Sequence, residues 1–186
     1  MAQQTADVII IGGGITGTST AYQLALRGQR VILLEKRFIA AGGTGRTGGI
    51  IRQHYSNETT IRMAKHALGV WSDFDAVIGG DPGFQRTGAL FFVSPDDVDG
   101  LKANIDLQKR CGVNVEFLDA AAICEFAPYL NVADIGGGAY EPEAGCADGS
   151  MAANAFAQRA RDLGTVILQG VEVTRVLSTH DRVVGV

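Results

Sequence analysis

The sequence is poor in the residues on which disulfide-rich, zinc-binding and nucleic-acid-binding proteins depend. It has three cysteines in 186 residues, an odd number, and no CxxC pair, so neither a disulfide framework nor a zinc site is expected. Three reduced thiols indicate a cytoplasmic protein. The 16 lysines and arginines form no block, and the net charge is −4, which argues against a role in binding nucleic acid.

Long hydrophobic runs are also missing. The apolar stretch from Val8 to Ile11 is far too short to span a bilayer, and the chain does not open with the basic and apolar regions of a signal peptide. Hydrophobic residues still make up 46% of the sequence. This composition is typical of a globular protein, and the length allows one sizeable core, or one domain and part of another.

The most informative segment runs from Val8 to Lys36. An apolar stretch is followed by a glycine cluster, by small residues with helical spacing, and by a second apolar stretch. This order predicts a strand, a turn, a helix and a second strand. In the GxGxxG pattern, Gly12 permits a tight turn, Gly14 lets the backbone approach a pyrophosphate, and Gly17 lets helix and strand pack closely. The helix N-terminus would offer its N–H groups to the phosphates.

An acidic residue stands where this fingerprint has one. Glu35 ends the second apolar stretch, where a carboxylate accepts the ribose hydroxyls of an adenosine and repels a 2′-phosphate. A glycine-rich turn in some other α/β protein is the alternative, but such a turn requires no acid at this place. The segment therefore predicts binding of an adenine dinucleotide, and it leaves open which one.

Between Phe38 and Arg52 the sequence departs from a nicotinamide-binding Rossmann domain, which would continue into another helix and strand. The segment is rich in glycine and nearly uncharged. Its backbone is expected to pass close to something, and a second part of the cofactor is the natural candidate. A flexible surface loop is the alternative. Ile50 and Ile51 argue against it, because large apolar side chains are not expected at the tip of a mobile surface loop.

The rest of the chain alternates helical and strand patterns. Helices are expected over 57–77, beginning at Ser56 or Asn57, and over 95–110, 119–127 and 148–163; strands are expected over 89–93, 113–118, 136–140, 166–168, 171–177 and 182–186. The chain stops inside the last apolar run, which indicates a truncated chain or a fragment.

The chain resembles a known family in four segments, which read GGTGRTGGIIRQHYS (42–56), FQRTGALFF (84–92), YEPEAGCADGS (140–150) and GVEVTRV (170–176). With the glycine motif and Glu35, they resemble the FAD-dependent D-amino-acid oxidase superfamily, and within it the branch of sarcosine oxidase, glycine oxidase and dimethylglycine dehydrogenase. The resemblance covers essentially all of the chain. Family members are considerably longer, which implies that these residues are the N-terminal portion of an enzyme.

The resemblance implies an α/β fold. A Rossmann-type FAD-binding domain is expected, with the beginning of an α+β substrate domain inserted into it. The implied boundaries are 1–83 for the first part of the FAD-binding domain, 84–143 for the first part of the substrate domain, and 144–186 for the continuation of the FAD-binding domain.

The resemblance also implies which residues hold FAD. They are Gly12, Gly14, Ile15, Thr16 and Gly17 at the pyrophosphate, Glu35 and Lys36 at the adenosine ribose, Gly43, Thr44, Arg46, Gly48, Gly49 and Ile50 on the flavin side, and Val173 at the adenine through its backbone. Val173 has an alternative as an ordinary core residue of a strand. Branches with covalent flavin have a histidine where this chain has Arg46, and 145–153 contains no histidine. Non-covalent FAD is therefore expected.

The candidate residue for binding the substrate is Arg52, whose position resembles that of the carboxylate-binding arginine of sarcosine oxidases. A planar guanidinium can make two parallel hydrogen bonds to a carboxylate. The alternative is an arginine in a surface ion pair, which contributes under ~1 kcal/mol. His54 and Tyr55 follow closely, and either line the substrate pocket or pack as ordinary residues.

The function implied is oxidation of the C–N bond of a small amino acid or N-methyl amino acid, such as a sarcosine-like compound, by hydride transfer to FAD. The flavin carries this chemistry, so neither a protein nucleophile nor a metal is required. The resemblance leaves room for partner subunits or an electron-acceptor protein. Two other functions stay open: an NAD-dependent Rossmann dehydrogenase, and a non-catalytic FAD-binding fragment or subunit.

Overall fold

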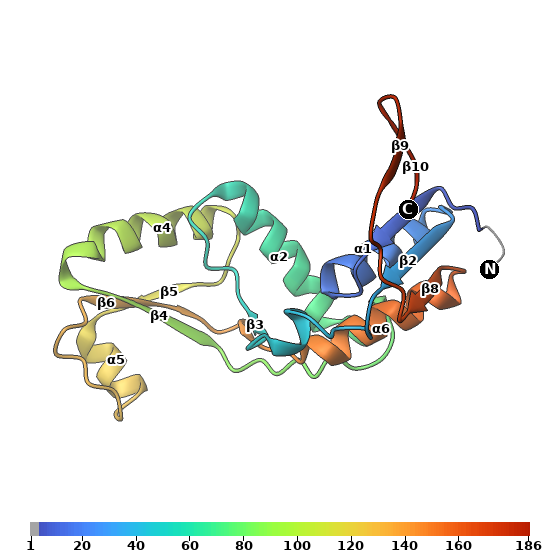
Figure 1. The fold of residues 1–186 in the computed structure, drawn as a ribbon. Coiled ribbons are helices and arrows are strands. Elements are labelled where there is room, and N and C mark those ends of the chain that lie inside the picture. The colour runs from blue at the N-terminus through green and yellow to red at the C-terminus, as the bar shows by residue number, and fades with distance from the viewer. Residues whose placement is uncertain (1–3) are drawn as a thin grey trace. The chain divides into compact units, whose positions relative to one another are not determined.

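A computed structural model describes residues 4–186 (Figure 1). They divide into two compact units. The first unit comprises the described residues up to Gly49 together with Phe74–Gly83 and Asp148–Val186, and the second comprises Ile50–Asp73 and Phe84–Ala147. This grouping differs from the expected boundaries, because residues 50–73 join the second unit and that unit extends to residue 147.

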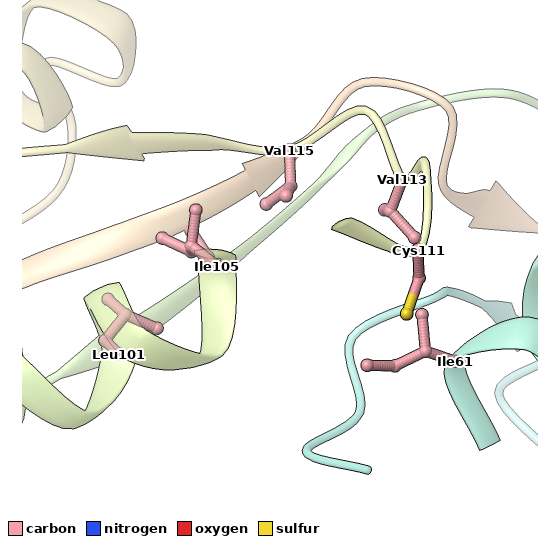
Figure 2. Packing of buried hydrophobic residues seen from close by; sticks show 7 residues of the cluster. Ile61, Leu101, Ile105, Cys111, Val113 and Val115 are labelled. Carbon is pink, nitrogen blue, oxygen red and sulfur yellow. The ribbon is translucent and has the colours of Figure 1, made fainter. Parts of the chain in front are cut away.

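Helix α2 (Glu58–Ser72) explains most of this difference. Its Ile61 is fully buried and belongs to the hydrophobic core of the second unit. The other buried members of that core are Leu101, Ile105, Cys111, Val113, Val115 and Ala139, and Figure 2 shows Ile61 directed towards Cys111. These partners lie far along the chain from Ile61, so the periodicity of the helix could not show which unit it joins.

A parallel sheet in the order β1–β2–β8 forms the centre of the first unit. Its strands are β1 (Val8–Ile11), β2 (Val31–Glu35) and β8 (Val166–Gln169), and α1 (Ile15–Leu26) connects the first two. Residues 31–34 of β2 are all buried, as expected for a central strand covered on both faces. The predicted strand–turn–helix–strand order is confirmed, and the sheet is of Rossmann type.

Helix α6 (Gly149–Asp162) packs against α1 within the first unit. Asp148 caps this helix, because its Oδ1 accepts hydrogen bonds from the N–H groups of Ser150 and Met151. The small residues buried on the two helices are Ala21 and Ala25 on α1, and Ala152, Ala153, Ala157 and Ala160 on α6. They allow a close approach of the helices. Helix α3 (Phe74–Val77) adds the ring of Phe74, which meets Phe156 edge-on at 5.4 Å.

The second unit contains an antiparallel sheet in the order β4–β6–β5. Its strands are β4 (Ala89–Val93), β5 (Glu116–Leu118) and β6 (Gly137–Glu141), and a separate pair is formed by β3 (Ile50–Ile51) and β7 (Gly145–Cys146). Its helices are α2, α4 (Val98–Arg110), which follows the 3-10 turn η2 (Pro95–Asp97), and α5 (Ala120–Phe126). Among residues 4–186, no helix has the length and hydrophobicity needed to cross a membrane.

Two predicted boundaries need adjustment. Asn57 is the cap of α2, since its Oδ1 accepts a hydrogen bond from the N–H of Thr60, but the helix ends at Ser72 instead of reaching 77. The strand expected over 113–118 is formed by Glu116–Leu118. Val113 instead donates its N–H to the carbonyl of Gln108 and closes the end of α4.

The strand expected over 171–177 is wrong. Strand β8 ends at Gln169, and Gly170 adopts φ +73°, a conformation that turns the chain away from an extended path. Val171 still donates its N–H to the carbonyl of Glu35, but 171–176 lie outside the strands. A hairpin follows, formed by β9 (Leu177–Thr179) and β10 (Arg182–Gly185). Val173 lies in the segment between β8 and this hairpin, so it is not part of a strand, and it is half-buried.

Candidate functional site

The turn after β1 depends on two glycines. Gly12 adopts φ +108°, which residues with a side chain rarely adopt, and its N–H donates to the carbonyl of Leu34 at 2.8 Å. A Cβ added to Gly17, in the first turns of α1, would collide with the carbonyl oxygen of Gly12. Helix and turn can therefore lie this close only because Gly17 has no side chain.

The start of α1 is tied to the glycine-rich segment. Gly14 is the N-cap of the helix, with extended backbone and no side chain to bond the first N–H groups. The N–H of Ile15 donates instead to the hydroxyl oxygen of Thr44 at 3.0 Å. A Cβ on Gly14 would lie 3.0 Å from the same oxygen. The turn that carries Thr44 therefore covers the first residues of α1, at the positive end of the helix dipole.

Glu35 closes the turn from the end of β2. Its Oε2 accepts a hydrogen bond from the N–H of Gly13 at 2.7 Å, and its Oε1 accepts one from the N–H of Arg37 at 2.8 Å. Burial resists ionisation of this carboxyl, but the two backbone donors, with the positive charges of Arg37 and Lys36, outweigh burial and lower the pKa of Glu35. The carboxylate is therefore ionised at neutral pH. Each oxygen keeps a second lone pair that can accept a hydroxyl.

The glycine-rich segment folds tightly against the start of α6. Thr44–Arg46 form a 3-10 turn, η1. A Cβ on Gly45 would collide with the carbonyl oxygen of Ala40, and a Cβ on Gly149 would collide with that of Thr44. The segment is thus a packed turn that requires glycine at these positions, and not the loose surface loop that the sequence left as an alternative.

Arg52 lies in the second unit, after β3. Its Nη1 donates to the carbonyl of His54 at 2.6 Å. The guanidinium lies over the ring of Tyr55, 4.8 Å from its centroid, and 5.6 Å from the centroid of Phe91. Within residues 4–186, no carboxylate forms an ion pair with this half-buried cation. The surface ion pair considered as an alternative for Arg52 is therefore not formed by the described residues.

The side chain of His54 contacts three other side chains of the second unit, those of Phe91, Gln108 and Glu141. Its ring stacks on Phe91, with the centroids 4.4 Å apart and the planes at 13°. Its Nδ1 lies 3.1 Å from Nε2 of Gln108 and 3.5 Å from Oε1 of Glu141. The side chain of His54 is 14% exposed and that of Glu141 is fully buried. The other oxygen of Glu141, Oε2, accepts a hydrogen bond from the N–H of Gln53 at 2.9 Å.

Comparison with known proteins decides the family. The profile of the family described as FAD dependent oxidoreductase matches residues 7–186. The chain belongs to this family.

Relatives in the FAD-dependent oxidoreductase family include enzymes of amino-acid oxidation. The chain is 32% identical to the sarcosine oxidase subunit beta of an Arthrobacter species, over 99% of this chain and 47% of that protein. It is 32% identical to the 4-methylaminobutanoate oxidase (formaldehyde-forming) of Paenarthrobacter nicotinovorans, over 96% of this chain and 22% of that protein. The crystal structure of L-proline dehydrogenase from P. horikoshii is similar with a TM-score of 0.89 and 32% identity, and covers 98% of this chain and 48% of that chain. The chain thus spans half or less of the length of these relatives.

The first unit fits the FAD of this family. A Cβ added to Gly12, Gly43 or Gly48 would meet no atom within 4 Å, so space is open beside these backbones. An ionised carboxylate at Glu35 and the N-terminus of α1 flank the turn. These groups are suited to ribose hydroxyls and to a pyrophosphate, respectively.

The predicted FAD-binding residues are only partly brought together. The first unit contains Gly12, Gly14, Ile15, Thr16, Gly17, Glu35, Lys36, Gly43, Thr44, Arg46, Gly48 and Gly49. Two hydrogen bonds connect three of the segments that contain these residues. One joins Glu35 to the turn after β1, and the other joins Thr44 to Ile15 at the start of α1. Arg46 is exposed and its Nε donates to the carbonyl of Gly42 at 3.3 Å. Ile50 belongs to the second unit and is 64% exposed.

Sequence reasoning missed the buried polar groups around His54. Strand alternation contained a signal for Glu141, because a strand that buries Ala139 directs residue 141 to the same face. Gln108 had a similar signal, because it follows Leu101 and Ile105 on the buried face of α4 at helical spacing. A polar residue at a core position of either element would have indicated a buried polar contact.

Proposed function

We propose that this chain forms the nucleotide-binding part, and the start of the substrate-binding part, of a flavin-dependent oxidoreductase. Its reaction is the oxidation of the C–N bond of a small amino acid or N-methyl amino acid. The cofactor is FAD, as in the family. When bound, FAD accepts the hydride from the substrate carbon. The protein's tasks are to hold the cofactor and to orient a substrate that carries a carboxylate.

The surroundings of Arg52 are the observation that supports a substrate with a carboxylate. A half-buried guanidinium that lies over two aromatic rings, with no carboxylate partner among residues 4–186, is suited to a planar anion from outside the chain. A carboxylate meets this requirement through two parallel N–H···O hydrogen bonds. The names of the relatives agree with this choice, because sarcosine, 4-methylaminobutanoate and proline all carry a carboxylate and an amine.

The residues for the cofactor follow from the first unit. Glu35 would accept the ribose hydroxyls, and the start of α1 from Gly14 to Thr16 would face the pyrophosphate. The turn Thr44–Arg46 and the glycines beside it would lie along the flavin side. Attachment of FAD is proposed to be non-covalent, because Arg46 cannot form the bond that a histidine forms at this place in covalent relatives.

Compartment and partners belong to the same proposal. Cys111, Cys124 and Cys146 are free thiols, which supports a reducing, cytoplasmic environment. The relative named as a subunit beta supports an assembly with partner subunits, or with an electron-acceptor protein.

The deciding experiment is a visible absorption spectrum of the protein purified with FAD supplied, before and after acid precipitation. Flavin absorbance that is released into the supernatant supports non-covalent FAD. Colour that stays in the pellet contradicts the interpretation of Arg46. A colourless protein that instead retains NAD would revive the nicotinamide-dependent alternative.

The reaction is tested next, under anaerobic conditions, with sarcosine, dimethylglycine and proline. Bleaching of bound FAD by any of these amines supports the proposed oxidation. N-methylethylamine is the matched control, because it resembles sarcosine but lacks the carboxylate. Bound FAD that none of the amino acids reduces supports the non-catalytic alternative.

A further inference from the structure

A buried carboxylate with an unsatisfied oxygen lies beside His54. Glu141 is fully buried at the end of β6. Its Oε2 accepts the N–H of Gln53, while Oε1 has no hydrogen-bond partner and lies 3.5 Å from Nδ1 of His54. In residues 4–186, His54 is the one cationisable side chain within ion-pair distance of Glu141.

Gln108 belongs to the same cluster, because its Nε2 lies 3.1 Å from Nδ1 of His54, and its buried Oε1 has no hydrogen-bond partner. Buried polar groups are nearly always hydrogen-bonded, and each unsatisfied one is costly. The amide nitrogen of Gln108 and Oε1 of Glu141 both face Nδ1 of His54, so the position of the ring proton decides which of these two groups the imidazole can satisfy.

Two positions of that proton are possible in a neutral ring. If Nε2 carries it, the single in-plane lone pair of Nδ1 accepts from the amide of Gln108, and the unprotonated Nδ1 lies 3.5 Å from Oε1 of Glu141. Two acceptors would then oppose each other in a buried place. If Nδ1 carries the proton, it can donate to Oε1 of Glu141. This tautomer gives up the hydrogen bond from Nε2 of Gln108 to Nδ1, 3.1 Å away, in exchange for a bond to a carboxylate, and hydrogen bonds to charged groups are the stronger ones. The amide of Gln108 keeps the carbonyl of Tyr55, 3.4 Å from its Nε2, as its acceptor.

We propose that Glu141 is the positioning residue of His54 and accepts the proton carried on Nδ1. This hydrogen bond holds the ring flat on Phe91 and beside Arg52, whose Nη1 donates to the carbonyl of His54. It leaves Nε2 of the neutral ring with a free lone pair. Nε2 can then accept an N–H of a substrate amine while Arg52 holds its carboxylate, and this last role rests on the proposed function.

The proton position can be measured without cofactor or substrate. Long-range proton–nitrogen NMR of protein labelled with ¹⁵N-histidine distinguishes a protonated from an unprotonated ring nitrogen, and His54→Asn identifies the signals of His54 among the three histidines. The expected result is a proton on Nδ1 of His54 in the wild-type protein. An unprotonated Nδ1 in the wild-type protein overturns the proposal.

Two variants separate Glu141 from Gln108. In Glu141→Gln the new amide can donate to Nδ1, so the proton is expected to move to Nε2. In Gln108→Leu the proton is expected to remain on Nδ1. The opposite pattern, a change in Gln108→Leu and none in Glu141→Gln, overturns the proposal. The wild-type spectrum decides the question if either variant fails to fold.

Failure of the proposed function has a different signature. If no amine reduces or perturbs bound FAD while Nδ1 carries the proton, the substrate assignment fails and the Glu141–His54 hydrogen bond stands. If sarcosine binds but Nδ1 is unprotonated, the hydrogen bond fails and the proposed function stands.

Discussion

The hydroxyl oxygen of Thr44 accepts a hydrogen bond from the N–H of Ile15 at 3.0 Å. This contact joins the glycine-rich segment to the first residue of α1 across 29 positions of sequence. It replaces the side-chain cap that α1 lacks, since Gly14 at the N-cap position has no side chain. The start of the helix is thus ordered by a residue of the segment expected to follow the flavin.

We expect Thr44→Val to destabilise the protein by about 1 kcal/mol, because a partly buried N–H loses its acceptor while the shape of the side chain is kept. Urea unfolding measures the difference. Thr20→Val is the control, since Thr20 is exposed on α1, the helix that Thr44 contacts, and the same substitution there should change stability by less than about 0.5 kcal/mol. Equal effects of the two substitutions would show that the Thr44 hydrogen bond contributes nothing.

Gly17→Ala is expected to destabilise the protein by about 1–3 kcal/mol, because the added methyl group collides with the carbonyl oxygen of Gly12. Weaker FAD retention should accompany the loss, since the turn must move. Gly69→Ala in α2 is the matched control, because a Cβ there meets no atom within 4 Å. That change should stabilise by about 0.5–1 kcal/mol through helix propensity. A neutral Gly17→Ala would mean that the turn yields without cost.

Local signals account for what the sequence predicted correctly. The glycine motif, the buried run of β2 and the caps Asn57 and Asp148 each depend on residues a few positions apart. The element boundaries that failed depend on other information. The turn at Gly170 follows from a positive φ, which a glycine permits but does not require.

Contacts between distant segments could not be predicted. Ile61 joins its core through residues such as Leu101 and Val115, and periodicity shows that a face is buried but not against what. The same holds for His54 and Glu141, which meet because β6 ends beside the chain that follows β3. Arg52 and His54 were singled out as site residues, but the contact between His54 and Glu141 could be found only in the structure.

The stability contributed by Glu35 should depend on pH. The pKa of Glu35 is lowered in the folded protein, so the folded state favours the ionised form. This contribution is therefore fully present above the ordinary pKa of about 4.5 and is lost as the pH falls through the lowered value. We expect the stability difference between wild type and Glu35→Gln to be largest near neutral pH and to shrink below about pH 4.5. Urea unfolding from pH 7 to pH 3 measures it, and a constant difference would contradict the hydrogen bonds to Gly13 and Arg37.

Arg52→Lys should weaken binding of sarcosine to the FAD-loaded protein by about tenfold, or ~1.4 kcal/mol, because an ammonium cannot form two parallel bonds to the carboxylate. Changes in the visible spectrum of FAD during anaerobic titration give the dissociation constant.

Binding of N-methylethylamine, which has no carboxylate, should be the same for both proteins. Arg62→Lys is the control, since Arg62 is exposed on α2 and pairs with Glu58. Equal weakening for the two amines would mean that Arg52 supports the fold of the pocket and does not bind the carboxylate. Unchanged sarcosine binding would contradict the role of Arg52 in holding the substrate carboxylate.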